Sequence, residues 1–256
     1  VQYITDTIST PLMIDTEGSQ IRTGDLGVDS ITLTMGQKIK VYNKHIDCDE
    51  ENIYIRPEIA VDQLQVGSLL FIDFDTIILR VDSLEGLKKN GYIICSVLSG
   101  GGMGNNKAVT IQQQGINLPA LSEKDAKSLE IAKKYNIRFC SMSFIDSADD
   151  VLELKKLHPN VKVVAKIETE KGVNNLDEIL DVTDGILIDR GDLSREIPLE
   201  RIAFAQKVII NKANAKNIPV FVATNLLDTM MSSLRPSRAE INDIVNTLLD
   251  GANGLV

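Results

Sequence analysis

Short apolar runs alternate with helical patterns from about residue 118 onward, at intervals of roughly 25 to 35 residues. The apolar runs cover 138–144, 161–168, 185–189, 219–224 and 254–256. The helical patterns lie near 123–135, 147–157, 174–181, 198–216 and 238–250. Because the runs are apolar on both sides, they predict strands of a parallel sheet that is covered by helices. This rhythm predicts an α/β fold built from βαβ units.

Two of the predicted helices begin with capping signals. Ser122 with Asp125, and Ser237 with Glu240, have the spacing of capping boxes.

The segment 25–117 has a different pattern. Its short apolar runs are broken by Gly, Asn and Asp, with no convincing helix, which predicts a small β-rich domain. Residues 12–14 before it predict a further strand of the α/β part. We therefore expect an α/β segment at 1–24, an inserted β-rich domain at 25–117, and the rest of the α/β part at 118–256.

Charge and cysteine content limit the function classes. The 256 residues include 36 acidic and 27 basic side chains, for a formal charge of -9, which argues against a nucleic-acid partner. The three cysteines form no metal or disulfide pattern and fit reduced thiols in the cytoplasm. No apolar stretch is long enough to predict a membrane span.

Lys166 and Glu168 end the apolar run 161–168. Because side chains alternate along a strand, both share the face of Val164, and we expect them to point inward. One interpretation is an ion pair within the core, with Glu168 or a neighbouring acid. The other is a fixed positive charge that meets a developing anion. The strand-end position favours the second, since (β/α) barrels place their chemistry there.

Glu168 and Asp192 follow consecutive predicted strands, so their carboxylates can converge on one divalent cation such as magnesium. Alternatively, Asp192 caps the next helix or pairs with Arg190. Gly191 allows a close approach of backbone to ligand, and Thr224 at the end of a strand is a weak signal by itself.

Other candidate motifs favour structural interpretations. The glycine-rich stretch 99–107 lacks the pattern of a phosphate-binding loop, and we interpret it as a hairpin turn. His45 and His158 are isolated, so a histidine general base is not supported.

Several stretches together resemble the pyruvate kinases. They are "DTEGSQIRTG", "INLPALSEKD", "VVAKIETEKGVNNLDEIL", "DGILIDRGDLSREIPLERIAFAQK", "PVFVATNLLDTM" and "RPSRAEINDIVNTLLDGA", in the family's order and spacing. The resemblance implies an α/β (β/α)8 TIM barrel, of which this chain supplies strand 3 to the start of strand 8. It also implies an inserted small β-barrel domain that closes over the site.

The resemblance also implies roles for individual residues. Glu168 and Asp192 match the ligands of Mg2+ or Mn2+, and Lys166 matches the lysine that offsets charge on the transferred phosphoryl group. Thr224 matches the hydroxyl in the proton path to the enolate. The backbone at Gly191 and Asp192 matches the group that holds the substrate carboxylate.

Further matches concern a second cation and the nucleotide. Asp15 and Thr16 match part of a monovalent-cation site for K+, and Arg22 and Lys107 match nucleotide-binding residues. The implied enzyme is a phosphotransferase that moves a phosphoryl group from phosphoenolpyruvate to ADP, giving pyruvate and ATP in the final step of glycolysis. Family membership also implies a cytoplasmic homo-oligomer, usually a tetramer.

The chain departs from the family pattern at several positions. Gln20 replaces an acid that the family links to potassium dependence. The usual "ARGDLG" is Asp189 to Ser194 here, which adds an acid beside an anionic substrate. No segment matches the first two barrel strands or the C-terminal domain. Two alternatives therefore stay open: a divergent homologue with weak or no catalysis, and a metal-dependent pyruvate-enolate lyase.

Overall fold

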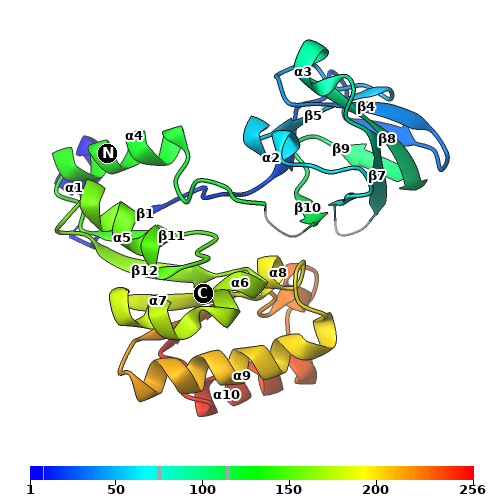
Figure 1. The fold of residues 1–256 in the computed structure, drawn as a ribbon. Coiled ribbons are helices and arrows are strands. Elements are labelled where there is room, and N and C mark those ends of the chain that lie inside the picture. Colours follow the sequence, from blue (N-terminus) through cyan, green and yellow to red (C-terminus); the bar gives the residue numbers. More distant parts are fainter. Residues whose placement is uncertain (8, 74–75, 114–115) are drawn as a thin grey trace. The chain divides into compact units, whose positions relative to one another are not determined.

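A computed structural model describes residues 1–256 except 8, 74–75 and 114–115 (Figure 1). The chain divides into two compact units. The α/β unit comprises Val1–Gly18 and Ala120–Val256, and the β unit comprises Ser19–Pro119. The chain therefore leaves the α/β unit after its first strand and re-enters it after the β unit.

The α/β unit contains a sheet of six strands. In spatial order these are β1 (Met13–Asp15), β11 (Phe139–Met142), β12 (Lys162–Ile167), β13 (Gly185–Asp189), β14 (Val220–Ala223) and β15 (Gly254–Leu255). Every neighbouring pair is parallel, which confirms the predicted α/β class. The carboxyl ends of all six strands therefore lie at one edge of the sheet.

Helices connect these strands (Figure 1). They are α4 (Glu123–Lys134), α5 (Ala148–Leu157), α6 (Glu170–Asn174), α7 (Leu176–Val182), α8 (Arg190–Leu193), α9 (Leu199–Ala215) and α10 (Arg238–Leu249), with a 3-10 turn η1 (Asp228–Met231). A further helix, α1 (Gln2–Thr7), precedes β1. The helix predicted near 174–181 is α7, and the short helix α6 before it was not predicted.

Capping side chains fix where several helices begin. Both predicted boxes are formed, at Ser122 with Asp125 and at Ser237 with Glu240. A third box, at Ser147 with Asp150, was not predicted. Each box satisfies backbone N–H groups that the first turn of a helix leaves without partners.

The two faces of β12 differ in burial. Val163, Ala165 and Ile167 are fully buried and belong to the core between sheet and helices. Ile179 of α7 and Ile209 of α9 cover this core, and the two helices lie beside one another (Figure 1). The alternation predicted for this strand is therefore confirmed, and Lys166 lies on the face away from the helices.

The β unit contains a seven-stranded sheet and a two-stranded sheet. The larger sheet has the spatial order β10 (Val109–Gln112), β6 (Leu69–Ile72), β7 (Ile77–Ser83), β8 (Tyr92–Ser99), β4 (Lys38–Tyr42), β5 (Asn52–Arg56) and β2 (Arg22–Thr23). The smaller sheet pairs β3 (Ser30–Leu33) with β9 (Gly101–Gly104).

Two details of the β unit differ from the predictions. Two short helices, α2 (Glu58–Asp62) and α3 (Leu87–Asn90), interrupt a segment predicted to lack helix. The stretch 99–107 was predicted to be a hairpin turn, but its residues 101–104 form the strand β9. A Cβ added at Gly100 would lie 2.3 Å from the carbonyl oxygen of Leu33, so the glycine allows the two chain segments to approach closely.

Among the described residues, no helix has the length and apolarity that crossing a bilayer requires.

Candidate functional site

Lys166 lies near the carboxyl end of β12 with its ammonium group among acceptors. Its Nζ is 3.2 Å from Oε1 of Glu168 and 3.6 Å from Oδ1 of Asp15, and it donates to Ser143 Oγ at 3.0 Å. Burial lowers the pKa of Lys166, but attraction by Glu168 and Asp15 outweighs burial and raises the pKa above its usual value. The lysine is therefore a fixed positive charge at the edge of the sheet.

Glu168 follows β12 and is the most enclosed acid of this edge. Its side chain is fully buried, and Oε2 accepts the backbone N–H of Phe144 at 2.7 Å. Oε1 lies beside the Lys166 ammonium but accepts no well-aligned hydrogen bond. Burial raises the pKa of Glu168 to about 7, against the opposing pull of Lys166. The carboxylate lacks the solvation that would stabilise its charge.

Three carboxylates meet beside this lysine. Glu168, Asp189 and Asp192 each place one oxygen within 4.8 Å of the others. The structure thus brings together the two acids that the sequence paired, and it adds Asp189. Oxygen ligands of this kind suit Mg2+ or Mn2+.

Asp189 ends β13 and is the N-cap of α8. Its Oδ1 accepts the N–H groups of Gly191, at 3.1 Å, and Asp192, at 3.4 Å. The alternative in which Asp192 caps the helix is therefore wrong, since Asp192 lies inside α8. The cap explains why this acid, close to the strand end, keeps a defined orientation.

Thr224 follows β14 with a left-handed backbone, at φ 69°. Its hydroxyl accepts the N–H of Gly191 at 2.8 Å and lies 3.2 Å from Asp189 Oδ1. It is also within donor distance of the carbonyl of Ala223, at 2.7 Å. A β-branched residue is rare in this conformation, and such strain gathers at functional sites.

Two arginines hold this edge of the sheet together. Arg190 donates to the carbonyl of Thr224 at 2.6 Å and pairs with Asp243 of α10 at 2.7 Å. Arg195 forms a salt bridge with Asp192 at 3.0 Å. The alternative in which Arg190 pairs with Asp192 is therefore wrong, since Arg190 pairs with Asp243.

Asp15 and Thr16, the predicted monovalent-cation residues, follow β1 in different environments. The Asp15 side chain is exposed, whereas Thr16 is buried. Thr16 Oγ1 accepts the N–H of Ser143 at 3.0 Å, and the hydroxyl of Ser143 donates to the Thr16 carbonyl at 2.8 Å. The Thr16 oxygens are thus already engaged within the sheet edge.

Arg22 and Lys107, the predicted nucleotide-binding residues, both belong to the β unit. Arg22 donates to the carbonyl of Asn106 at 2.8 Å and, through Nε, to Oε1 of Gln20. Lys107 Nζ pairs with Asp73 at 2.8 Å. The two basic residues lie on neighbouring backbone segments, since Thr23 and Lys107 exchange hydrogen bonds.

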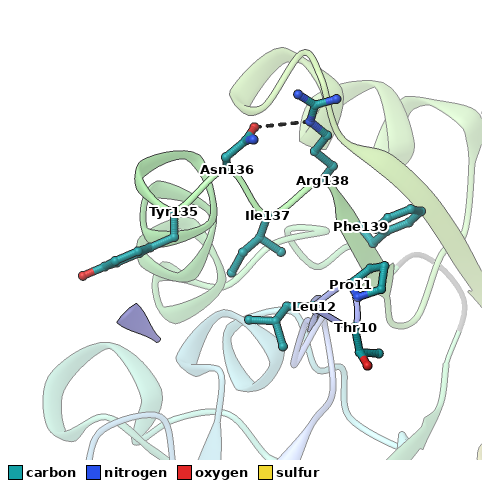
Figure 2. A pocket seen from close by; sticks show the side chains of 8 residues that line it. All are labelled: Thr10, Pro11, Leu12, Tyr135, Asn136, Ile137, Arg138 and Phe139. Atoms are coloured by element: carbon teal, nitrogen blue, oxygen red, sulfur yellow. Dashed lines mark hydrogen bonds between the residues drawn. The ribbon is translucent and has the colours of Figure 1, made fainter. Parts of the chain in front are cut away.

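A pocket of about 330 Å³ lies at the other edge of the α/β sheet (Figure 2). It is lined by residues just before β1 and by residues up to and including the first of β11, namely Thr10, Pro11, Leu12, Tyr135, Asn136, Ile137, Arg138 and Phe139. Because the strands are parallel, these residues lie at their amino ends, away from the carboxylates. The pocket is therefore separate from the candidate site.

The family model for the pyruvate kinase barrel domain matches residues 3–256. The chain belongs to the pyruvate kinase family. It is 36% identical over 250 residues to the pyruvate kinase of Geobacillus stearothermophilus, covering 96% of this chain and 42% of that protein. It is 37% identical over 249 residues to that of Dictyostelium discoideum, with coverages of 94% and 49%.

A solved structure agrees with this membership. The crystal structure of a pyruvate kinase from Cryptosporidium parvum matches with a TM-score of 0.80 and 32% identity, over 96% of this chain and 52% of that one. The chain thus spans about half the length of the relatives it matches. The pyruvate kinase family generally uses a divalent metal, in keeping with the carboxylate oxygens at the sheet edge.

Proposed function

We propose that the protein containing this chain is a pyruvate kinase that transfers a phosphoryl group from phosphoenolpyruvate to ADP. The observation that carries the proposal is the gathering of Lys166 with Glu168, Asp189 and Asp192 at the carboxyl edge of the sheet, in a chain of this family. The products are pyruvate and ATP, at the final step of glycolysis. For the fold, we propose a (β/α)8 barrel supplied here from strand 3 to the start of strand 8, with 25–117 as the inserted lid domain.

The residues at the site fit a divalent cation. Glu168 Oε1 is buried 3.2 Å from the Lys166 ammonium and makes no well-aligned hydrogen bond with it, so this oxygen keeps acceptor capacity for a cation. Glu168 and Asp192 would hold Mg2+ or Mn2+. When bound, the ion would supply positive charge against the phosphoryl oxygens and the enolate.

The chain's own groups position the substrate and offset its charge. Lys166 Nζ neutralises charge that builds up on the transferred phosphoryl group. The Thr224 hydroxyl lies in the proton path to the methylene carbon of the enolate. The N–H groups of Gly191 and Asp192 hold the substrate carboxylate, and since both already donate to Asp189, the substrate has to compete with that side chain.

The remaining assignments concern the second cation, the nucleotide and the assembly. Asp15 and Thr16 contribute to a K+ site, and Arg22 and Lys107 bind the phosphates of the nucleotide. We also assign the protein to the cytoplasm, in keeping with its three free cysteines, and expect a homotetramer as is usual in the family.

The decisive experiment replaces Lys166 by Met in the full-length protein. Pyruvate formation is followed with Mg2+, phosphoenolpyruvate and ADP, and the wild type is expected to be active only when ADP is present. Lys166→Met should lower kcat by at least about 10³-fold, since it removes a charge used in the transition state. Its circular dichroism should be unchanged.

Three results would contradict the proposal. Consumption of phosphoenolpyruvate without ADP indicates a lyase, and no turnover by the wild type indicates a homologue without catalysis. Unchanged turnover by Lys166→Met removes that lysine from the mechanism. A parallel assay with and without K+ tests the monovalent-cation site that we assign to Asp15 and Thr16. Gln20 stands where the family has an acid linked to potassium dependence.

A further inference from the structure

Asp189 lies beside Glu168 and Asp192, at a position where the family's motif has alanine. The residues assigned above as metal ligands therefore do not include it. One of its oxygens lies within 4.8 Å of ligand oxygens of Glu168 and Asp192. It is partly buried at the end of β13, in the strand next to β12. The question is whether it only caps α8 or also binds the cation.

The hydrogen bonds of Asp189 leave one oxygen available. Oδ1 lies within hydrogen-bonding distance of the N–H groups of Gly191 and Asp192 and of the Thr224 hydroxyl. In the described part of the chain, no hydrogen bond or ion pair involves Oδ2. A carboxylate has about four acceptor sites on its two oxygens. The cap therefore fixes the side chain and leaves its second oxygen available.

A second observation concerns the charges around Glu168. Glu168 Oε1 is fully buried and accepts no hydrogen bond, although a buried acceptor normally has a partner. Lys166 is the ammonium beside it, and its Nζ also contacts Asp15 and Ser143. Lys166 pairs with Glu168 and Arg195 pairs with Asp192, whereas no ion pair in the described part of the chain involves Asp189, so the three carboxylates carry more negative charge than these two cations balance.

We propose that Asp189 is a third protein carboxylate of the divalent-cation site, held in position by its bonds to the start of α8. The inference rests on the cation site of the proposed function and adds a residue to it. A site with three acids binds the ion more tightly than one with two, because ligand charge contributes to affinity for Mg2+ and Mn2+.

The test measures Mn2+ binding to the full-length protein by electron paramagnetic resonance, without substrates. Asp189→Asn keeps an oxygen that accepts the N–H groups of Gly191 and Asp192 but removes the charge. It is expected to weaken Mn2+ binding at least about tenfold, the lower range for changes around a metal site. Asp189→Ser, which also caps helices, should show a similar loss. The matched control is Asp181→Asn. Asp181 is an exposed acid of α7 that pairs with Lys216, so the Mn2+ affinity of this variant should equal that of the wild type.

Each outcome decides between defined alternatives, with folding checked by thermal melting. Asp189→Asn and Asp189→Ser with wild-type affinity would overturn the inference and leave Asp189 as a cap only. Glu168→Gln separates this failure from failure of the proposed function. If Glu168→Gln loses Mn2+ while the Asp189 variants keep it, the two-acid site stands. If Glu168→Gln also binds Mn2+ with wild-type affinity, the assignment of the cation site to these carboxylates is wrong.

Discussion

At the scale of single residues, the chemistry depends on hydroxyl and charged groups whose orientation the backbone fixes. Thr224 is the clearest case, because its left-handed conformation directs the hydroxyl toward Gly191 and Asp189. The strain of this conformation is acceptable only where the surrounding bonds hold it.

Replacement of Thr224 tests the proposed proton path. Thr224→Val removes the hydroxyl and should lower kcat about 10²-fold or more, the range for loss of a positioned proton-transfer group. Thr224→Ser keeps the hydroxyl and should stay within about tenfold of the wild type. The measurement is steady-state pyruvate formation, with Mn2+ affinity as the control. Equal rates for the Val and Ser variants would exclude the hydroxyl from the proton path.

Residue predictions from sequence succeeded where strand geometry alone decides them. Lys166 and Glu168 were placed together because side chains in a strand alternate, and the two do contact one another. The environment of Asp189 and the pairing of Arg195 with Asp192 were missed. Both depend on the turn after β13, whose conformation follows from tertiary contacts and not from local periodicity.

At the scale of elements, capping boxes give the helices defined starting points. Glu240 in the first turn of α10 accepts the N–H of Ser237 at 2.7 Å and that of Thr229 at 2.8 Å, and the hydroxyl of Thr229 also donates to it. The bonds from Thr229 are the main reason why the pKa of Glu240 falls to about 2. One carboxylate thus joins the turn η1 to the helix.

This gives a pH dependence of stability. Because the pKa is lowered in the folded protein, Glu240 stabilises it above the ordinary value of 4.5, and this contribution is lost as the pH falls toward about 2. Glu240→Gln should therefore lower the thermal midpoint at pH 7, and the difference from the wild type should shrink between pH 4.5 and pH 2. A difference that is constant over this range would show that the charge of Glu240 does not contribute.

Most elements of the α/β part were predictable because strong periodicity and caps mark them. The short helix α6 was not, since its five residues are too few for a helical period to be recognised. β9 was also missed. Its glycines give no apolar pattern, and it forms only because it pairs with β3, far away in sequence.

At the scale of the whole molecule, the two units have separate cores. Each contains buried cysteines, Cys140 in the α/β unit and Cys48 with Cys95 in the β unit. Burial raises the pKa of Cys95 and of Cys140 to about 12, and it also raises that of Cys48. Reactive thiolate is therefore scarce in the folded protein.

Alkylation of these thiols should report the unfolding of each unit. At pH 8, a maleimide pulse is expected to leave all three cysteines largely unmodified, and labelling should rise only as urea unfolds the surrounding core. Mass spectrometry of the peptides separates Cys140 from Cys48 and Cys95. Labelling of Cys140 without urea, at the rate of an unfolded control peptide, would contradict its burial.

At this scale the sequence predicted a β-rich segment between two α/β segments, because composition and periodicity change along the chain. The strand order of the β unit was beyond prediction, since β2 and β10 come at the two ends of that order and are nevertheless joined by the bridge between Arg22 and Ala108, far apart in the sequence.

One guanidinium connects helix α10 with the carboxyl edge of the sheet. Arg190 donates through Nη2 to the carbonyl of Thr224 and through Nη1 to the carboxylate of Asp243. A planar guanidinium can hold both acceptors at once in a fixed geometry, whereas a lysine ammonium is a point charge on a flexible stem. The backbone position of Thr224 is therefore linked to the position of α10 through a single side chain.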